Sequence, residues 1–214
     1  MIGNDVVDLQ DGDARPGSRH PRFDRRVFAA NELAALASSA APDRLRWVFW
    51  AAKEAAYKVA RKQDPQCVFS PVRFLVTLSG VSRGVVEFGQ ARYPVRVEGS
   101  NDAVHVVATH ACVPAKRIVL GMRKLSPEAL RDASAPSRAV RELAVSRVSG
   151  FWNDGGVVTV VQDGRVPMLE RDGVRVAADL SLSHHGRWVA FACELAGSIL
   201  SPAREPERVA RVSV

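Results

Sequence analysis

The sequence predicts an α+β fold in which one order of elements, a strand, a helix and then a small group of strands, occurs twice along the chain. In the first half, helical segments precede three valine-rich, partly alternating runs that Gly, Ser, Asn and Asp separate, and the same order of elements begins again after Pro114. The chain has 214 residues, of which 47% are hydrophobic. This is sufficient for one domain of ordinary size or for two small packed halves, and it excludes an intrinsically disordered protein.

The first half is expected to span residues 1–115. Residues 2–9 are typical of a short strand, and residues 23–38 are typical of a helix with its apolar side chains inward. The following helix is expected to have Asp43 as its N-cap and to run to about Lys62. Valine-rich runs indicate three further strand segments, at residues 68–78, 84–99 and 103–113.

The second half is expected to span residues 116–199, and residues 200–214 are expected to form a flexible tail. The half begins with a predicted strand, a helical turn capped by Ser126 and an amphipathic helix that ends at Gly150. Further strand segments are predicted at residues 156–164, 165–173 and 179–195.

The charge of the chain indicates the kind of partner. The formal net charge is +7 and the pI is about 9.9, which favours an anionic partner: a nucleic acid, a phosphorylated small molecule or an acidic protein. Between residues 15 and 26, five arginines accompany one acid. This segment suits a solvated loop or an RNA-binding arm, but such an arm would interleave exposed aromatic residues. Phe23, the one aromatic residue there, better suits an anchor for the next helix.

The chain is expected to be cytoplasmic. Its first residues carry acids where a secretory signal would carry basic residues, and no apolar run approaches the roughly 20 residues of a membrane span. Cys67, Cys112 and Cys193 lie far apart without a CxxC pair. We therefore expect buried thiols in a reducing compartment rather than a disulfide framework or a zinc site.

Three ionisable residues suggest a phosphoryl-transfer site. Asp5 lies in an otherwise apolar strand, so its carboxylate is either at an exposed end or paired with a cation or a metal. Glu54 and Lys58 stand one helical turn apart, a spacing that also forms ordinary ion pairs on solvated helices. Together, two carboxylates from separate elements and a nearby lysine match the needs of Mg²⁺ and a pyrophosphate.

A polar stretch in the second half, SLSHHGRW, adds candidate phosphate donors. Ser183, His184 and His185 precede a glycine and an alternating apolar strand. Adjacent side chains of a strand point to opposite faces, so only one of the two histidines is expected to serve a site. A surface histidine without such a role is the alternative. The stretch DGRVP, which contains Arg165, is by itself an ordinary turn signal.

These stretches resemble the signatures of the 4′-phosphopantetheinyl transferases. The resemblance is carried by IGNDVVDL, WAAKEAAYK and SLSHHGRWVAFA, and by FDRRVFAANEL after the first of them. The first Asp motif resembles the holo-acyl-carrier-protein synthase type. The helix SRAVRELAVSRV resembles the arginine-bearing helix of the larger, surfactin-synthetase-type members. The likeness extends from Ile2 to about Leu195.

The resemblance implies a pseudo-dimeric α+β fold. Two similar halves would each have a small antiparallel sheet packed on a long helix, with the active site in the cleft between them. Coenzyme A would donate its 4′-phosphopantetheine arm to a serine of an apo acyl, aryl or peptidyl carrier protein, and adenosine 3′,5′-bisphosphate would leave. A monomer is expected because one chain supplies both halves. Neither nucleic acid nor membrane is expected as a partner.

The resemblance also implies roles for individual residues. Asp5 and Glu54 match ligands of Mg²⁺, and Lys58 matches a lysine that works at the phosphates and the attacking hydroxyl. The residues that match coenzyme A contacts, with His184 at the 3′-phosphate, are Arg138, Arg165, Ser183 and His184. The face expected to dock the acidic carrier protein consists of Arg19, Arg22, Arg25 and Arg26.

The chain departs from the family pattern in three ways. The larger members place the Ser-His half first, whereas here the Asp and Lys-Glu half leads, although a two-fold pseudo-dimer can assemble its site from either order. The second acid of the larger members falls at Val7, which leaves Asp8 or a water to complete the metal shell. The turn at Arg165 has one residue more than the family's Gly-Lys-Pro pattern.

Two other hypotheses compete with a transferase. A non-catalytic module that binds coenzyme A or a carrier protein is supported by the loss of the acid at Val7, and a basic nucleic-acid-binding domain is supported by the arginines between residues 15 and 26. Transfer of phosphopantetheine to an apo carrier in the presence of Mg²⁺ would separate all three.

Overall fold

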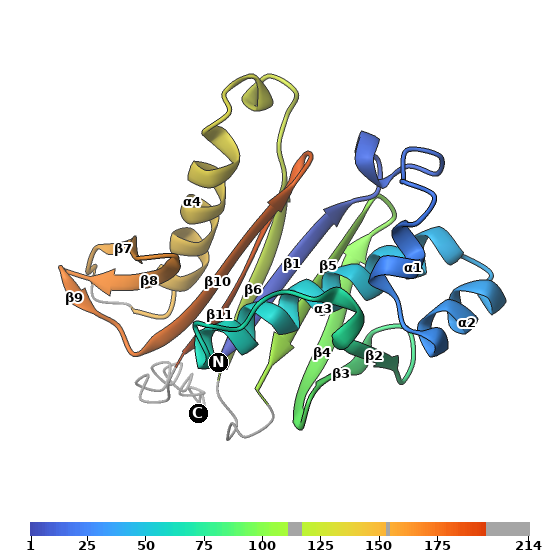
Figure 1. Ribbon diagram of the computed structural model, residues 1–214. Coiled ribbons are helices and arrows are strands. Elements are labelled where there is room, and N and C mark those ends of the chain that lie inside the picture. Colours follow the sequence, from blue (N-terminus) through green and yellow to red (C-terminus); the bar gives the residue numbers. More distant parts are fainter. Residues whose placement is uncertain (111–116, 153–154, 196–214) are drawn as a thin grey trace, which may run out of the picture.

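The computed structural model describes residues 1–110, 117–152 and 155–195 (Figure 1). Helices and antiparallel sheets make up the described chain, which confirms the α+β prediction. The expected tail at 200–214 and Cys112 lie outside the described residues. Of the other two cysteines, Cys193 is buried and Cys67 is half-buried.

The first sheet has five antiparallel strands in the order β1-β5-β4-β3-β2. Helix α3 (Pro42–Gln63) covers one of its faces. Gly3 permits this close packing, because a Cβ atom there would lie 2.1 Å from the backbone oxygen of Ala55. The strands are β1 (Ile2–Asp8), β2 (Leu75–Leu78), β3 (Arg83–Phe88), β4 (Ala91–Ser100) and β5 (Ala103–Thr109).

The second half has two three-stranded sheets, in the orders β10-β11-β6 and β7-β8-β9, and helix α4 (Ala135–Ser149) packs on the first of them. In each half, the first strand pairs with the last strand along the chain, and that last strand pairs with the one before it. The resulting orders are β1-β5-β4 in the first half and β6-β11-β10 in the second. The strands are β6 (Arg117–Lys124), β7 (Val158–Asp163), β8 (Val166–Arg171), β9 (Val174–Arg175), β10 (Ala178–His185) and β11 (Trp188–Leu195).

Three segments predicted as single elements are each divided into two. The expected helix at 23–38 forms α1 (Phe23–Val27) and α2 (Ala30–Ser38), because Phe28 is extended and buried. The second helix then begins where the Glu32 carboxylate accepts the Ala29 N–H at 2.8 Å.

The runs at 84–99 and 179–195 each fold as a hairpin. Their turns contain Gly89 and Gly186, with φ of 59° and 51°, a conformation that glycine adopts without steric cost. A glycine turn inside each run therefore divides the expected single strand into two. The result is that His185 ends one strand, β10, and Trp188 begins the next, β11.

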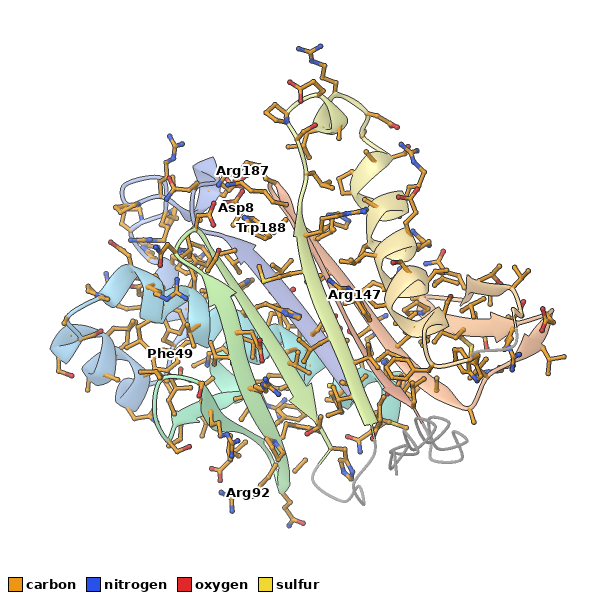
Figure 2. The ribbon with its side chains drawn as sticks, turned by 180° about the vertical axis from the view of Figure 1, so that it is seen from behind. Asp8, Phe49, Arg92, Arg147, Arg187 and Trp188 are labelled. Atoms are coloured by element: carbon orange, nitrogen blue, oxygen red, sulfur yellow. The ribbon has the colours of Figure 1, made fainter. Side chains whose placement is uncertain are left out.

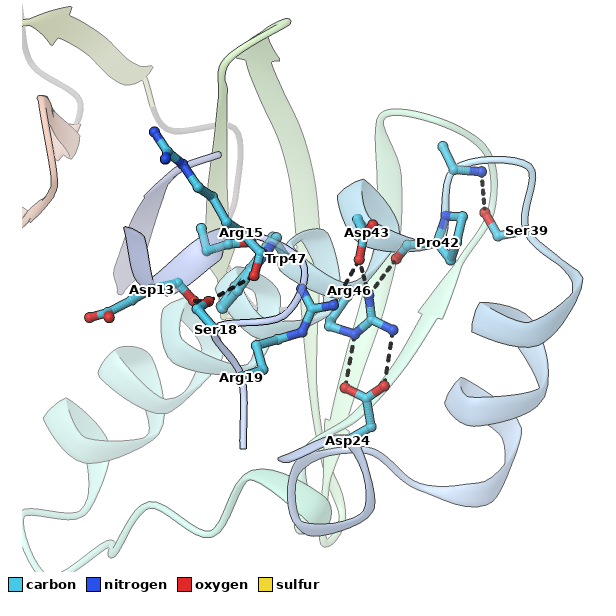
Figure 3. A network of polar contacts seen from close by, with 12 residues as sticks. Asp13, Arg15, Ser18, Arg19, Asp24, Ser39, Pro42, Asp43, Arg46 and Trp47 are labelled. Atoms are coloured by element: carbon cyan, nitrogen blue, oxygen red, sulfur yellow. Dashed lines mark hydrogen bonds and ion pairs between the residues drawn. The ribbon is translucent and has the colours of Figure 1, made fainter. Parts of the chain in front are cut away.

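The expected N-cap Asp43 is wrong by two positions: α3 is capped by Ala41 and has Pro42 in its first turn. The Asp43 carboxylate instead accepts hydrogen bonds from Arg19 at 2.9 Å and Arg46 at 2.7 Å (Figure 3). Arg46 also binds both carboxylate oxygens of Asp24, at 2.8 and 2.9 Å. This network fixes the segment before α1 against the start of α3.

The two halves meet where β1 and β10 lie side by side between α4 and α3 (Figure 1). These strands belong to different sheets, and side chains of β10 satisfy the backbone of β1. The N–H groups of Ile2 and Asn4 donate to Asp179 at 2.6 Å and to Ser181 at 2.9 Å. A polar seam therefore joins the halves, since each buried backbone donor needs a partner.

Candidate functional site

Asp5, Glu54 and Lys58 come together in the seam between the halves. Asp5 faces α3 from β1, and Glu54 and Lys58 project from neighbouring turns of α3. The Lys58 ammonium donates to the Asp5 carboxylate at 3.0 Å and to the backbone oxygen of Asn4 at 2.7 Å. The helical spacing of Glu54 and Lys58 thus places both on the face of α3 that meets β1, and not on a solvated face.

The Glu54 carboxyl titrates unusually. Burial, and then the nearby charge of Asp5, raise its pKa to about 7, while Lys58 acts in the opposite direction. Two carboxylates that repel each other in a partly buried site have the chemistry of a divalent cation site, because a shared cation would stabilise both charged forms. Asp5 and Glu54 therefore fit a hard metal ion with oxygen ligands.

Within the described part of the chain, Asp5 and Glu54 are not joined by a third metal-binding side chain. In the ranges 1–110, 117–152 and 155–195, no group of three or more His, Cys, Asp and Glu side chains is arranged to hold a metal ion. Val7 is buried in the core of the first half. Asp8 is bound by Arg187 through both of its oxygens, each at 2.7 Å. The alternative in which Asp8 completes a metal shell is therefore not supported.

Asp8 and Arg187 instead tie the halves together at one end of the sheets, as Figure 2 shows from behind. Burial alone would raise the pKa of the Asp8 carboxyl. The hydrogen bonds from the Arg187 side chain and backbone outweigh that effect and lower the pKa to about 2. The negative charge of Asp8 is thus already neutralised by the Arg187 guanidinium.

The two adjacent histidines have different surroundings. His184 is close enough to Lys58 and Asp5 to feel their charges, and burial and then Lys58 lower its pKa. His185 accepts the backbone N–H of Asp8 at 3.2 Å and so serves the seam. Of the two, His184 is thus the histidine whose pKa is affected by Lys58 and Asp5.

A cavity of about 450 Å³ extends from this cluster along β10 toward the β7–β8 turn. Apolar and cationic side chains share its wall, which suits a ligand with an uncharged body and anionic groups. The lining residues are Tyr57, Lys58, Arg61, Lys62, Pro65, Arg165, Val166, Pro167, Leu180, Ser181 and Leu182.

The coenzyme contacts implied by resemblance are only partly brought together. Arg165 lines the cavity and Lys58 links the cavity to the carboxylates. Arg138, near the start of α4, is not among the described residues that line the cavity, and it binds Asp132 at 2.9 Å and Ser134 at 3.1 Å. Ser183 is also absent from the described lining and is buried against Asn4, and His184 is exposed and likewise not part of that lining.

Sequence reasoning missed Tyr57, Arg61 and Lys62. A signal for two of them was present, because Arg61 and Lys62 continue the helical spacing of Glu54 and Lys58 by one further turn. The Lys62 ammonium is already bound to Asp179 at 2.6 Å and to the backbone oxygens of Ile2 and Leu180 at 2.7 and 2.8 Å. The helical spacing would therefore have predicted Arg61 as a second cation of the cavity, next to Lys58.

The first lysine of the helix motif, Lys53, has a structural position. Its ammonium binds the Glu32 carboxylate at 2.8 Å, and neither side chain is exposed. The other Glu32 oxygen accepts the Val76 N–H at 2.8 Å. Burial lowers the pKa of Lys53, and Glu32 opposes that shift. Lys53 and Glu32 therefore join α2, α3 and β2 on the side of α3 away from the cavity.

The four arginines expected to dock a carrier protein do not share one environment. Arg22, Arg25 and Arg26 are exposed around α1. Arg19 has a side chain only 16% exposed and is held by Asp43 (Figure 3). Three of the four are therefore accessible, whereas Arg19 supports the segment that carries them.

Comparison with models of protein families gives a match over the first half of the chain. The family model described as the 4′-phosphopantetheinyl transferase superfamily (ACPS) matches residues 1–109, which include Asp5 on β1 and Glu54 and Lys58 on α3. No curated protein and no solved structure matches the chain. In the described ranges, no helix combines the length and the apolar character needed to cross a membrane.

Proposed function

The chain belongs to the 4′-phosphopantetheinyl transferase superfamily, and we propose that it transfers the 4′-phosphopantetheine arm of coenzyme A to a serine of an apo acyl, aryl or peptidyl carrier protein. The observation that carries this proposal is the convergence of Asp5, Glu54 and Lys58 at one end of a cavity with cationic walls. Phosphoryl transfer depends mainly on positioning and on charge stabilisation, which these residues can supply.

The proposed reaction breaks the pyrophosphate of coenzyme A. The carrier serine oxygen bonds to the β-phosphorus, and the bond from that phosphorus to the bridging oxygen breaks. Adenosine 3′,5′-bisphosphate leaves with the electron pair, and a base takes the serine proton. Lys58, which donates to Asp5 at 3.0 Å, would neutralise charge on the transferring group and orient the attacking hydroxyl.

We propose that the reaction requires Mg²⁺. Asp5 and Glu54 would hold the ion, which supplies Lewis-acid stabilisation of the pyrophosphate when it is bound. The raised pKa of Glu54 supports this assignment, since it reflects a carboxylate that is buried beside another carboxylate. Water would supply the remaining ligands, because Mg²⁺ usually keeps several waters in protein sites.

Coenzyme A would lie along β10 in the cavity between the halves. Leu180, Leu182 and Pro167 offer an apolar wall, while Arg61 and Arg165 offer guanidinium groups for phosphates. His184 is not among the described residues that line the cavity, but it interacts electrostatically with Lys58, which does, and it would contact the 3′-phosphate from that side. Arg138 could contribute only after release from Asp132, so we assign it a secondary role.

The proposed docking face for the acidic carrier protein consists of Arg22, Arg25 and Arg26, with Arg19 as their support. Arginine suits this task because its planar fork makes two parallel hydrogen bonds to a carboxylate. Nucleic acid is a poorer partner. Among the described residues, the exposed large apolar side chains include no aromatic ring on which a base could stack.

We further propose that residues 1–115 and 116–199 are two halves of one cytoplasmic monomer. The shared pairing orders β1-β5-β4 and β6-β11-β10 support this division. The site at the seam would then be complete in a single chain, because Asp5 comes from the first half and His184 from the second.

The decisive experiment is transfer to a purified apo carrier protein. The protein is incubated with Mg²⁺, coenzyme A and an apo acyl, aryl or peptidyl carrier, and intact mass spectrometry records the addition of one phosphopantetheine. Omission of Mg²⁺ should abolish the product. A chain that binds coenzyme A but modifies none of the three carrier classes would instead be the non-catalytic module, and the transferase proposal would be wrong.

A further inference from the structure

A buried polar cluster lies on the side of β1 opposite Asp5. Its members are Asn4, His105 and Ser183, from β1, β5 and β10, and their exposed fractions are 0%, 0% and 7%. The Asn4 side-chain amide donates to the Ser183 hydroxyl at 2.9 Å and lies 3.1 Å from Nε2 of His105. Buried polar groups are costly unless they are paired, so such a cluster fixes the geometry of the elements that carry it.

Asn4 is connected to three elements through its backbone as well. Its N–H donates to Ser181 on β10 at 2.9 Å, and its carbonyl oxygen accepts from Lys58 on α3 at 2.7 Å. The same Lys58 ammonium binds Asp5, the next residue along β1. The position of Asn4 therefore sets both the distance from β1 to β10 and the direction of the Lys58 ammonium.

Ser183 uses its hydroxyl within this cluster. The oxygen accepts from Asn4 and lies 3.4 Å from the backbone oxygen of Ala190, to which the hydroxyl can donate. The cavity is lined by Ser181 and Leu182 from the same strand, and Ser183 is not part of the described lining. A contact between Ser183 and a phosphate would require the hydroxyl to turn its hydrogen away from Ala190, at a residue that is only 7% exposed.

His105 is suited to its place in the cluster. Burial, and then the charge of Lys58, lower its pKa to about 4, so the ring is neutral near pH 7. A neutral ring with its hydrogen on Nδ1 can accept the Asn4 amide at Nε2, although Nδ1 itself has no hydrogen-bond partner among the described residues. The cluster thus holds Asn4 from both sides, by β5 of the first half and β10 of the second.

We propose that Ser183 is a positioning residue that acts through Asn4, and that it does not contact coenzyme A. The Asn4–Ser183 bond sets the register between β1, which carries Asp5, and β10, which carries the neighbouring His184. This inference rests on the proposed phosphopantetheine transfer for its catalytic consequence. It assigns Ser183 a role different from the coenzyme contact that family resemblance implies.

The test compares Ser183→Ala, Asn4→Leu and the double variant with the unchanged protein. Calorimetry gives Kd for coenzyme A and for 3′-dephospho-coenzyme A, transfer assays give kcat, and thermal unfolding gives Tm. Each single variant should lower kcat by about 10- to 100-fold, as misplacement of a catalytic group does. The Kd for both donors should change by less than about threefold, since no hydrogen bond to either ligand is lost.

The double variant should be no worse than the worse single variant in kcat and in Tm, because both substitutions remove one shared bond. Ser183→Thr keeps the hydroxyl and should retain most of the kcat that Ser183→Ala loses. Asn31→Ala, at an exposed position of α2, controls for the loss of an asparagine side chain and should leave all three measurements unchanged.

A different result would overturn the inference. If Ser183→Ala weakens coenzyme A by about tenfold or more and spares 3′-dephospho-coenzyme A, Ser183 contacts the 3′-phosphate. Additive effects of Asn4→Leu and Ser183→Ala on Tm would show that the two residues are not coupled. If the unchanged protein transfers nothing, the proposed function fails separately, and the coupling in Tm and the Kd values still decide whether Ser183 acts through Asn4.

Discussion

Arg187 binds both carboxylate oxygens of Asp8, each at 2.7 Å, and also donates its backbone N–H to Asp8 at 3.0 Å. The bond links the turn after β10 to the last residue of β1. A residue that resemblance made a candidate metal ligand is thereby part of the connection between the halves. Loss of the Arg187–Asp8 bond should therefore lower the stability of the folded protein.

Arg187→Ala should lower the stability of the protein at neutral pH by about 2 kcal/mol, since it leaves the buried Asp8 carboxylate without its cation. The pKa of Asp8 in the folded protein is lowered to about 2. A lowered carboxyl pKa contributes stability above the unfolded value, and that stability is lost as the pH falls from about 4 to 2.

Urea unfolding of the two proteins at pH 7 and at pH 2.5 tests this prediction. The difference between them should be large at pH 7 and smaller at pH 2.5, where the stabilisation in the unchanged protein is partly lost. A difference that does not depend on pH would contradict the assigned pKa shift.

Asp5→Asn and Glu54→Gln should each reduce transfer by at least about 10²-fold, because each removes a charged ligand proposed for Mg²⁺. The fold should be retained, as neither residue belongs to a hydrophobic core. Transfer is measured across a Mg²⁺ titration, with Asp163→Asn as a matched control at a carboxylate that is 75% exposed. Near-normal turnover of either site variant at low Mg²⁺ would show that the ligand assignment is wrong.

His184→Ala should raise KM for coenzyme A much more than for 3′-dephospho-coenzyme A, because only coenzyme A carries the 3′-phosphate. His185→Ala is the matched control. It should leave both KM values unchanged but lower stability by about 1 kcal/mol, since the Asp8 N–H loses its acceptor. Steady-state kinetics with both donors give the answer, and equal effects of His184→Ala on the two donors would remove the 3′-phosphate role.

The double variant Arg22→Glu, Arg25→Glu should weaken carrier binding and flatten its dependence on salt. Exposed charges act mainly on the encounter of two proteins and are screened within about 10 Å at 0.1 M salt. Calorimetry with each partner should show an almost unchanged affinity for coenzyme A.

Two controls sharpen this prediction. Arg92→Glu changes an exposed arginine on the far end of the first sheet (Figure 2) and should not affect the carrier. Arg19→Ala should reduce stability instead, because it removes the bond to Asp43. Loss of coenzyme A affinity in the double variant, with normal carrier binding, would assign the two arginines to the phosphate site.

Lys53→Met should mainly lower stability and Lys58→Met should mainly lower kcat, although both lysines belong to one helix motif. Loss of Lys53 leaves the buried Glu32 carboxylate unpaired and should cost about 3–5 kcal/mol of stability. Lys58 is partly exposed, so its loss should mainly lower kcat. Urea unfolding and transfer kinetics of both variants separate the roles. A stable, inactive Lys53 variant would contradict the structural assignment.

Local sequence patterns predicted the features that depend on local geometry. The 3.6-residue period of a helix was sufficient to place Glu54 and Lys58 on one face, and the β1 and α3 segments were located to within one or two residues. The orientation of Ser183 and the use of Asp8 were beyond such patterns, because both depend on residues about 180 positions away in the sequence. The break at Phe28 likewise follows from packing against Phe49 of α3.

The seam between β1 and β10 makes the angle between the halves open to change by substitution. A ladder of backbone hydrogen bonds is nearly indifferent to side-chain identity, whereas here Asp179, Ser181 and His185 supply the acceptors for β1. One codon change can therefore lengthen, shorten or remove a single connection and leave the strands themselves intact. Single substitutions at the seam can therefore change the width of the neighbouring cavity, in evolution or by design, and so suit it to a different donor or carrier.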